Sequence, residues 1–319
     1  MILADNSARH QFRISKVGSA ARGSLTDNAE GEIGAVFERS LYVVIGGQWI
    51  CLAPANAGMG PLNALCVPQG IEISLGAIAC VSDPAFIVDG NLIIKNSASF
   101  SLKHAQEWKP VVPVDWDARS LSAGLRALDE NLVAGLPQDG LAPLLLSDVL
   151  PRPLLPVPAA ARAAAHHLRQ MILAVHNSDQ HHVDARPLMA LLGLGPGLTP
   201  SGDDFIGGAM VTLHVLGLDE LRDHIHSLVR SSATAATNQI SVAHLEAAAS
   251  GYGSEALHAI INDILQGRGA AFSKDVHAID AVGHTSGWDA LVGVVTVLRA
   301  WLEAQQAWHN RERGYFVAQ

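Results

Sequence analysis

Two different hydrophobic patterns meet near residue 150 of this 319-residue chain. Ahead of that point, short apolar runs are separated by turn residues, and Gly46-Gly47 and Asp89-Gly90 each lie between two such runs. These dipeptides favour two-residue hairpin turns, in which both residues adopt positive φ. Runs of this length and spacing predict a barrel- or sandwich-like β domain. The expected strands cover residues 43–45, 49–52, 71–75, 77–81, 85–88 and 92–95.

The second half of the chain has the apolar spacing of helices. Segment 200–216 is apolar on nearly all sides, which is typical of a helix in the middle of a bundle, and we expect the last helix to lie close to it. The other expected helices cover residues 116–132, 159–175, 219–229, 240–249, 254–266 and 287–307. A proline-rich stretch over 136–158 is typical of a semi-rigid connector. We therefore predict an α+β chain: a small β-rich domain with a late helix over residues 1–150, followed by an all-α helical domain over 151–319.

Composition limits the partners of this chain. Its net charge of −9 disfavours nucleic acid, because phosphate binding needs clustered Lys and Arg. Only 16% of the residues are charged and 49% are hydrophobic, so we expect other subunits or copies of the chain to cover further surface. The three cysteines have no CxxC spacing and are interpreted as small buried hydrophobes of a reducing compartment. The first twenty residues have no apolar signal core, and no apolar run reaches about 20 residues, so we expect a cytoplasmic protein with no membrane partner.

A glycine-rich segment over residues 193–204 precedes the apolar helix and reads Gly-Leu-Gly-Pro-Gly-Leu-Thr-Pro-Ser-Gly-Asp-Asp. Glycines let backbone amides approach a ligand, and the free amides and dipole of a helix start favour a bound anion. The pattern is neither a Walker A loop nor a dinucleotide-binding fingerprint. It predicts a site for a small anionic substrate, with the binding residues Gly195, Gly197, Thr199, Ser201 and Gly202.

The two carboxylates that end this segment admit two interpretations. Asp203 and Asp204 would repel an anion unless a metal such as Mg²⁺ bridged them, so both are candidate catalytic residues and metal ligands. Alternatively, Ser201 and Asp204 form a capping box, which needs no ligand. Capping leaves the glycines and Asp203 unexplained, and we therefore expect a ligand site.

Residues 283–289 repeat the Ser-Gly-x-Asp pattern at a second expected helix start. Thr285, Ser286 and Asp289 are candidate substrate-binding residues there, and His284 is a candidate acid or base because its ordinary pKa lies near neutrality. Two helix starts with hydroxyls and a carboxylate would suit a polar substrate with two ends. The alternative is an unrelated capping box beside a loop histidine.

A third candidate segment contains Thr237, Asn238 and Ser241. Thr237 and Ser241 are four residues apart and so share a helix face. These neutral side chains either bind substrate or cap their own helix.

Together, the motifs at 195–204, 237–241 and 283–289 resemble a bacterial family named for AllH, a subunit of the oxamate carbamoyltransferase of anaerobic allantoin breakdown. The resemblance covers most of the C-terminal half. It implies a subunit that works with two others to cleave oxalurate with phosphate into oxamate and carbamoyl phosphate. The implied small-molecule partners are carbamoyl phosphate, oxamate or phosphate. No Arg or Lys lies within the three motifs, so a cationic group would come from the N-terminal half or from another subunit.

Two other functions stay open on the residues alone. The low charge content and the lack of a complete catalytic constellation fit a non-catalytic binding or assembly subunit. Asp203 and Asp204 also fit a free-standing, metal-dependent hydrolase or lyase. Neither HExxH nor GxSxG occurs in the chain, which argues against a zinc hydrolase and a serine hydrolase.

Overall fold

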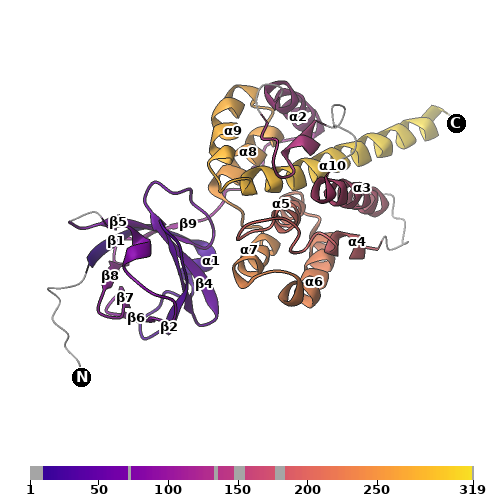
Figure 1. Cartoon of the computed structure of the whole chain (residues 1–319). Coiled ribbons are helices and arrows are strands. Elements are labelled where there is room, and N and C mark those ends of the chain that lie inside the picture. The colour runs from indigo at the N-terminus through magenta and orange to yellow at the C-terminus, as the bar shows by residue number, and fades with distance from the viewer. Residues whose placement is uncertain (1–9, 71–72, 133–135, 147–154, 177–183, 318–319) are drawn as a thin grey trace. The chain divides into compact units, whose positions relative to one another are not determined.

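The computed structural model describes residues 10–70, 73–132, 136–146, 155–176 and 184–317. These residues divide into two compact units, residues 1–110 and 111–319 (Figure 1). The division therefore lies well ahead of residue 150, where composition placed the domain boundary. The first unit is built of strands and the second of helices, which confirms the predicted order of a β-rich domain and a helical domain.

The first unit is a closed β-barrel with one extra strand. Its strands follow the order β5-β4-β3-β2-β6-β7-β8-β1-β9, and an antiparallel pairing of β1 with β5 closes the ring. β9 lies outside the ring and pairs in parallel with β1. The strands are β1 (His10–Gly18), β2 (Glu30–Val36), β3 (Leu41–Ile45), β4 (Gln48–Pro54), β5 (Asn63–Pro68), β6 (Pro84–Val88), β7 (Asn91–Ile94), β8 (Ala98–Ser101) and β9 (Gln106–Trp108). A short helix, α1 (Ser19–Arg22), follows β1.

Both predicted hairpins are confirmed. Gly46 and Gly47 connect β3 to β4 with φ of 58° and 81°, and Asp89 and Gly90 connect β6 to β7 with φ of 51° and 70°. Positive φ at both central residues matches the twist of the flanking strands, as in a type I′ turn. Inside the barrel, the rings of Phe12 and Phe100 stack with their centroids 4.7 Å apart.

The strand predicted over residues 77–81 is wrong. A short 3₁₀ turn, η2 (Leu75–Ala77), lies there instead. Leu75 and Ile78 are both buried in the barrel core, and their spacing of three residues suits a 3₁₀ turn, whereas a strand places every second residue on one face. The strand expected over residues 71–75 is not formed in its described part either, since residues 73–74 have no regular structure and Leu75 begins the 3₁₀ turn; residues 71–72 lie outside the described residues.

Two of the three cysteines are buried, as predicted, and the third is not. Burial raises the pKa of Cys51 to about 11, so its thiol stays protonated, and Cys66 is also buried. Cys80 is exposed in the loop before β6, where it packs against no core.

The second unit contains the helices that the sequence predicted. Two of them extend well beyond the prediction, to Ala236 instead of residue 229 and to Val317 instead of residue 307, and the helices over Arg186–Met189 and Phe272–Asp280 were not predicted. Its helices are α2 (Ala118–Leu132), α3 (Pro156–His176), α4 (Arg186–Met189), α5 (Ser201–Val215), α6 (Asp219–Ala236), α7 (Gln239–Ala249), α8 (Glu255–Leu265), α9 (Phe272–Asp280) and α10 (Ser286–Val317), with the 3₁₀ turns η3 (Ala142–Leu145) and η4 (Gly269–Ala271). No described helix is long and apolar enough to cross a lipid bilayer.

Helix α2 belongs to the helical unit rather than to the barrel. Its predicted apolar face, Leu121, Leu125, Leu128 and Leu132, is buried in the core of the second unit. Ala142, in the described part of the proline-rich connector, is fully buried in the same core. This shared core is the physical reason why the two units divide at Pro110 and not near residue 150.

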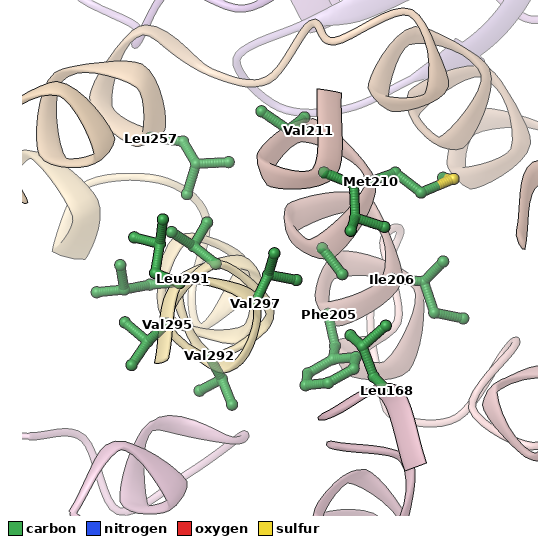
Figure 2. Packing of buried hydrophobic residues seen from close by; sticks show 14 of the residues in the cluster. Leu168, Phe205, Ile206, Met210, Val211, Leu257, Leu291, Val292, Val295 and Val297 are labelled. Atoms are coloured by element: carbon green, nitrogen blue, oxygen red, sulfur yellow. The ribbon is translucent and has the colours of Figure 1, made fainter. Parts of the chain in front are cut away.

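Helices α5 and α10 form the centre of the second unit, as the apolar surface of segment 200–216 predicted. Their apolar side chains, which include Phe205, Ile206 and Leu291, join one continuous cluster (Figure 2). The backbones approach closely because each helix contributes a glycine at the contact. A Cβ atom on Gly208 would lie 2.0 Å from the carbonyl oxygen of Ala290, and one on Gly293 would lie 2.1 Å from that of Phe205.

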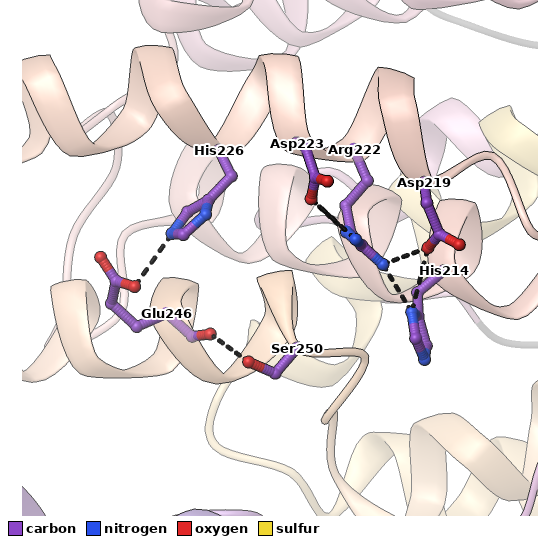
Figure 3. Close-up of polar contacts among 7 residues, drawn as sticks. All are labelled: His214, Asp219, Arg222, Asp223, His226, Glu246 and Ser250. Carbon is purple, nitrogen blue, oxygen red and sulfur yellow. Dashed lines mark hydrogen bonds and ion pairs between the residues drawn. The ribbon is translucent and has the colours of Figure 1, made fainter.

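A surface network joins the end of α5 to α6 and α7 (Figure 3). The Arg222 guanidinium contacts Asp219 and lies 2.6 Å from Nδ1 of His214, while His226 Nε2 lies 2.9 Å from Glu246 Oε2 on α7. Most of these groups are partly exposed, so solvent screening keeps their contribution to stability small. His226 is thereby occupied in a contact between α6 and α7.

A buried carboxyl pair lies where α8, η4 and α9 meet. Asp263 accepts a hydrogen bond from Arg268 Nε at 2.6 Å, and its carboxyl is hydrogen-bonded to that of Asp275. Burial, and then the Asp263 carboxyl, raise the pKa of Asp275, while Lys274 and Arg268 act in the opposite direction. One proton shared between the two carboxyls removes most of their mutual repulsion.

We predict that Gly208→Ala lowers the free energy of unfolding by about 1–3 kcal/mol, because the new methyl group forces α5 and α10 apart. Gly207→Ala is the matched control on the same helix. Its Cβ would lie 3.7 Å from that of Ala248, an ordinary contact, so the gain in helix propensity should leave stability equal or raise it by roughly 0.5–1 kcal/mol. Urea denaturation of both variants measures the difference. Equal stability of the two would contradict the proposed close contact.

We predict that Asp275→Asn makes stability less dependent on pH. A pKa raised in the folded state stabilises the fold below the ordinary Asp pKa of about 4, and this contribution is lost as the pH rises through the raised value. The uncharged amide has no such proton to lose. The difference in unfolding free energy between variant and wild type should therefore grow between pH 5 and pH 8, as urea titrations can show. Parallel pH profiles would rule this out.

Candidate functional site

Two glycines of the glycine-rich loop lie where other backbone atoms approach very closely. Gly193, Gly195 and Gly197 all have positive φ, at 73°, 121° and 101°. A Cβ on Gly193 would lie 1.9 Å from the carbonyl oxygen of Ala236, and one on Gly195 would lie 2.8 Å from the amide nitrogen of Ser201. Gly197 is exposed and has open space around it. The first two glycines thus serve packing, whereas Gly197 serves the turn.

Several amides at the start of α5 are paired within the chain. The helix begins at Ser201, and its N-cap residue is Pro200, whose carbonyl accepts from the amides of Asp203 and Asp204 at 2.9 and 3.1 Å. The Gly202 amide donates to the carbonyl of Leu194 at 2.9 Å. Because Ser201 is inside the helix and does not cap it, the capping box is not formed. The same pairing leaves these three amides unavailable to an anion.

Asp203 holds the loop in place. It is 2% exposed, and its two carboxylate oxygens accept from the Gly193 amide at 2.7 Å, the Ser241 hydroxyl at 2.6 Å and the Thr237 hydroxyl. Asn238 adds a further tie, since its side-chain amide donates to the Leu198 carbonyl at 2.7 Å. Its Oδ1 atom caps α7 by accepting from the Ser241 amide at 3.0 Å. The third candidate segment, residues 237–241, therefore contacts the glycine-rich loop, and Asp203 holds the two segments together.

The starts of α5 and α10 lie side by side. The Thr199 hydroxyl lies 2.8 Å from that of Ser286, the first residue of α10. Ser286 is hydrogen-bonded to the carboxyl of Asp204, and Ser201 is hydrogen-bonded to the carboxyl of Asp289. The hydrogen bonds therefore cross between the two Ser-Gly-x-Asp motifs: the serine that begins each helix is hydrogen-bonded to the aspartate of the other helix. We call this arrangement exchanged, and Asp204 and Asp289 the exchanged carboxyls.

The glycine of each motif has the same role. A Cβ on Gly202 would lie 2.0 Å from the carbonyl oxygen of Leu191, and one on Gly287 would lie 2.2 Å from that of Ile279. In both motifs a preceding segment crosses the first helical turn at a distance that only glycine permits. The repeated pattern therefore reflects repeated backbone geometry.

The exchanged carboxyls, Asp204 and Asp289, are buried together without a basic partner. Asp289 is fully buried, Asp204 is half-buried, and the Oδ2 atom of each is enclosed with no hydrogen-bond partner. Burial raises the pKa of both groups, and the charge of Asp289 raises that of Asp204 further. Within the described part of the chain, neither carboxyl forms an ion pair with Lys or Arg. The sequence paired Asp204 with Asp203, but the Asp203 oxygens accept from other donors, and the charge of Asp289 affects the Asp204 carboxyl more than that of Asp203 does.

Part of the proline-rich stretch that was predicted to be a connector reaches this pair. The amide of Leu141 donates to Asp289 Oδ1 at 2.6 Å. Gly140 has a φ of 67°, and a Cβ there would lie 2.5 Å from the same oxygen, so both its backbone conformation and this close approach require glycine. The sequence contains a signal for a turn at this place, since Asp139-Gly140 is a favoured turn pair. His284 lies beside this turn with Nε2 3.8 Å from Asp139 Oδ2, and its side chain is 88% exposed.

The candidate residues thus fall into separate groups. The exchanged cluster combines two carboxyls with four hydroxyls: Asp204, Asp289, Thr199, Ser201, Thr285 and Ser286. The loop anchor combines Asp203, Thr237, Asn238 and Ser241. Among the described residues, no three His, Cys, Asp or Glu side chains gather as a metal site. The binding and catalytic roles of all these residues stay predictions.

We predict that Asp203→Asn lowers the free energy of unfolding by about 2 kcal/mol or more, because an amide has one acceptor oxygen and its NH₂ would face a donor. Asp204→Asn is the matched control, since its Oδ2 has no donor to lose. Chemical denaturation compares them, and hydrogen exchange at the Gly193 amide reports whether the loop loosens. An equal loss in both variants would mean that Asp203 is no special anchor.

Comparison with known proteins agrees with the resemblance drawn from the motifs. No solved structure matches the chain. The family model described as oxamate carbamoyltransferase subunit AllH matches residues 191–298. This segment begins just before the glycine-rich loop and ends within α10, so it includes the loop anchor and both exchanged motifs. The part of this chain that carries the candidate site is therefore similar to the AllH subunit of oxamate carbamoyltransferase, as its sequence motifs indicated.

Proposed function

We propose that this chain is a subunit of an oxamate carbamoyltransferase-type enzyme and that the exchanged cluster forms part of its substrate site. The family match carries this proposal, because the matched residues 191–298 contain both Asp204 and Asp289. The expected reaction transfers a carbamoyl group between oxamate and phosphate.

The cluster suits substrates of this kind. Oxamate and oxalurate are planar and carry both a carboxylate and an amide. Hydroxyls of Thr199, Ser201 and Ser286 can each donate and accept, so they can bind either end. In group transfer, most of the rate enhancement comes from positioning the two reactants and stabilising the charge that develops on the transferred group.

The two carboxyls set a condition on this function. An anionic substrate can approach Asp204 and Asp289 only when their charges are neutralised, by bound protons or by a cation. Their raised pKa values favour protonation in the free chain, and a protonated carboxyl can donate a hydrogen bond to a substrate oxygen. Asp203, with its oxygens occupied, is a positioning residue in this scheme.

The name of the matched family describes a subunit, and partner subunits are therefore part of the proposal. The missing cationic group is expected from such a partner. A partner would also cover apolar residues such as Val111 and Val114, which are 75% and 86% exposed in this chain.

We predict that Asp204→Asn and Ser286→Ala each lower kcat of the reconstituted complex by about 10²-fold or more, with assembly unchanged. The assay measures carbamoyl phosphate formed from oxalurate and phosphate, and size-exclusion chromatography measures assembly. Asp275→Asn, a buried acid outside the cluster, serves as control and should keep full activity.

Three outcomes separate the candidate functions. Full activity of Asp204→Asn in an intact complex would identify a non-catalytic assembly subunit. Metal-dependent turnover by the isolated chain would identify a free-standing hydrolase or lyase. Loss of activity confined to the cluster variants supports the carbamoyltransferase subunit.

A further inference from the structure

Two carboxylate oxygens at the paired helix starts lack any partner inside the chain. Asp204 Oδ2 and Asp289 Oδ2 are both enclosed without a hydrogen bond, and the Asp289 side chain is 0% exposed. A buried, unpaired carboxylate is strongly unfavourable, so such groups are protonated, paired with a base or bound to a metal. The arrangement of the remaining atoms distinguishes these possibilities.

The rest of each carboxyl is already fixed in place. Asp289 Oδ1 accepts from the Leu141 amide at 2.6 Å, and Ser201 and Thr285 are hydrogen-bonded to the same carboxyl. Ser286 and Thr199 do the same for Asp204. These contacts orient both side chains before any ligand arrives, and one oxygen of each carboxyl stays without a partner. Preorganised ligands of this kind reduce the entropy lost on binding.

The atoms gathered here are all hard oxygen donors. Two carboxylates come from Asp204 and Asp289, and hydroxyls come from Thr199, Ser201 and Ser286. Mg²⁺ prefers oxygen ligands, and in proteins it commonly takes one or two carboxylates and completes its shell with waters and substrate oxygens. Two carboxylates suffice for such a site, although no three His, Cys, Asp or Glu side chains gather together among the described residues.

The second buried carboxyl pair of the chain provides a contrast. Asp275 also has an enclosed, unpartnered Oδ2. Its neighbour Asp263, however, accepts a hydrogen bond from Arg268 Nε at 2.6 Å, and a further hydrogen bond joins the two carboxyls. An arginine and a shared proton therefore neutralise that pair. Neither device is present for Asp204 and Asp289 among the described residues.

We propose that Asp204 and Asp289 together bind one divalent cation of the Mg²⁺ class between the starts of α5 and α10. The ligand pair thus spans two helices and excludes Asp203, whose oxygens accept three hydrogen bonds. The cation offsets the negative charge of these two carboxylates. Its binding is a property of this chain alone and does not depend on the proposed transfer reaction.

The test measures the binding of Mn²⁺, a paramagnetic substitute for Mg²⁺, to the full-length chain in metal-free buffer at pH 8. Free Mn²⁺ is followed by electron paramagnetic resonance, and Mg²⁺ is added as competitor. We expect one Mn²⁺ per chain, displaced by Mg²⁺, and a rise in melting temperature on binding. Asp204→Asn and Asp289→Asn should each weaken binding at least about tenfold and abolish the rise in melting temperature.

Asp275→Asn is the matched control, because it removes a buried carboxyl with an unpartnered oxygen outside the cluster. It should bind Mn²⁺ as the wild type does. Circular dichroism checks that each variant is folded. Should either Asn variant unfold, Ser286→Ala is the milder variant, because it keeps both carboxylates. Its affinity for Mn²⁺ should be lower than that of the wild type but higher than that of the Asn variants.

Failure of the wild type to bind Mn²⁺ at pH 8 would overturn the inference. Equal weakening by Asp275→Asn, or unchanged binding by Asp289→Asn, would also overturn it. Mn²⁺ binding without carbamoyl transfer by the reconstituted complex would leave the cation site standing and count against the proposed function alone.

Discussion

The close contact between α5 and α10 is the constraint on which the helical unit depends. Gly208 and Gly293 let the two backbones approach to a distance that a methyl group would prevent. With the helices this near, their first turns lie side by side, and the hydroxyl of Thr199 reaches that of Ser286 at 2.8 Å. The polar cluster is thus a consequence of apolar packing several residues further along the same helices.

Three neighbouring carboxyls show how placement decides chemistry. Asp203 and Asp204 are adjacent in sequence but point to different neighbours across α5. Asp203 meets three donors and anchors a loop, whereas Asp204 meets Asp289 and keeps an oxygen unpartnered. A saturated carboxylate stabilises structure, and an unsaturated one is available to a ligand. Asp203 anchors the loop and Asp204 lies in the exchanged cluster because successive residues of a helix point about 100° apart.

The sequence predicted the two fold classes and most helices because apolar periodicity is a local property. Turn pairs such as Asp89-Gly90 predicted hairpins for the same reason. Barrel closure by β1 and β5 joins distant segments and was not predictable from spacing. The pairing of Asp204 with Asp289 was missed likewise, because it depends on the approach of two helices. The family resemblance located the right segment but not which carboxyls meet within it.

The exchange of serines between the two helix starts has a consequence for how the site comes into being. Neither motif completes its half alone, since Asp204 has a hydroxyl from Ser286 beside that of its own Thr199, and Asp289 has one from Ser201 beside that of its own Thr285. The cluster therefore forms in a single cooperative event, when residues that are far apart in the chain come together. Local opening at the first turn of either helix would dismantle both halves at once, so the site exists only while the centre of the helical unit is intact.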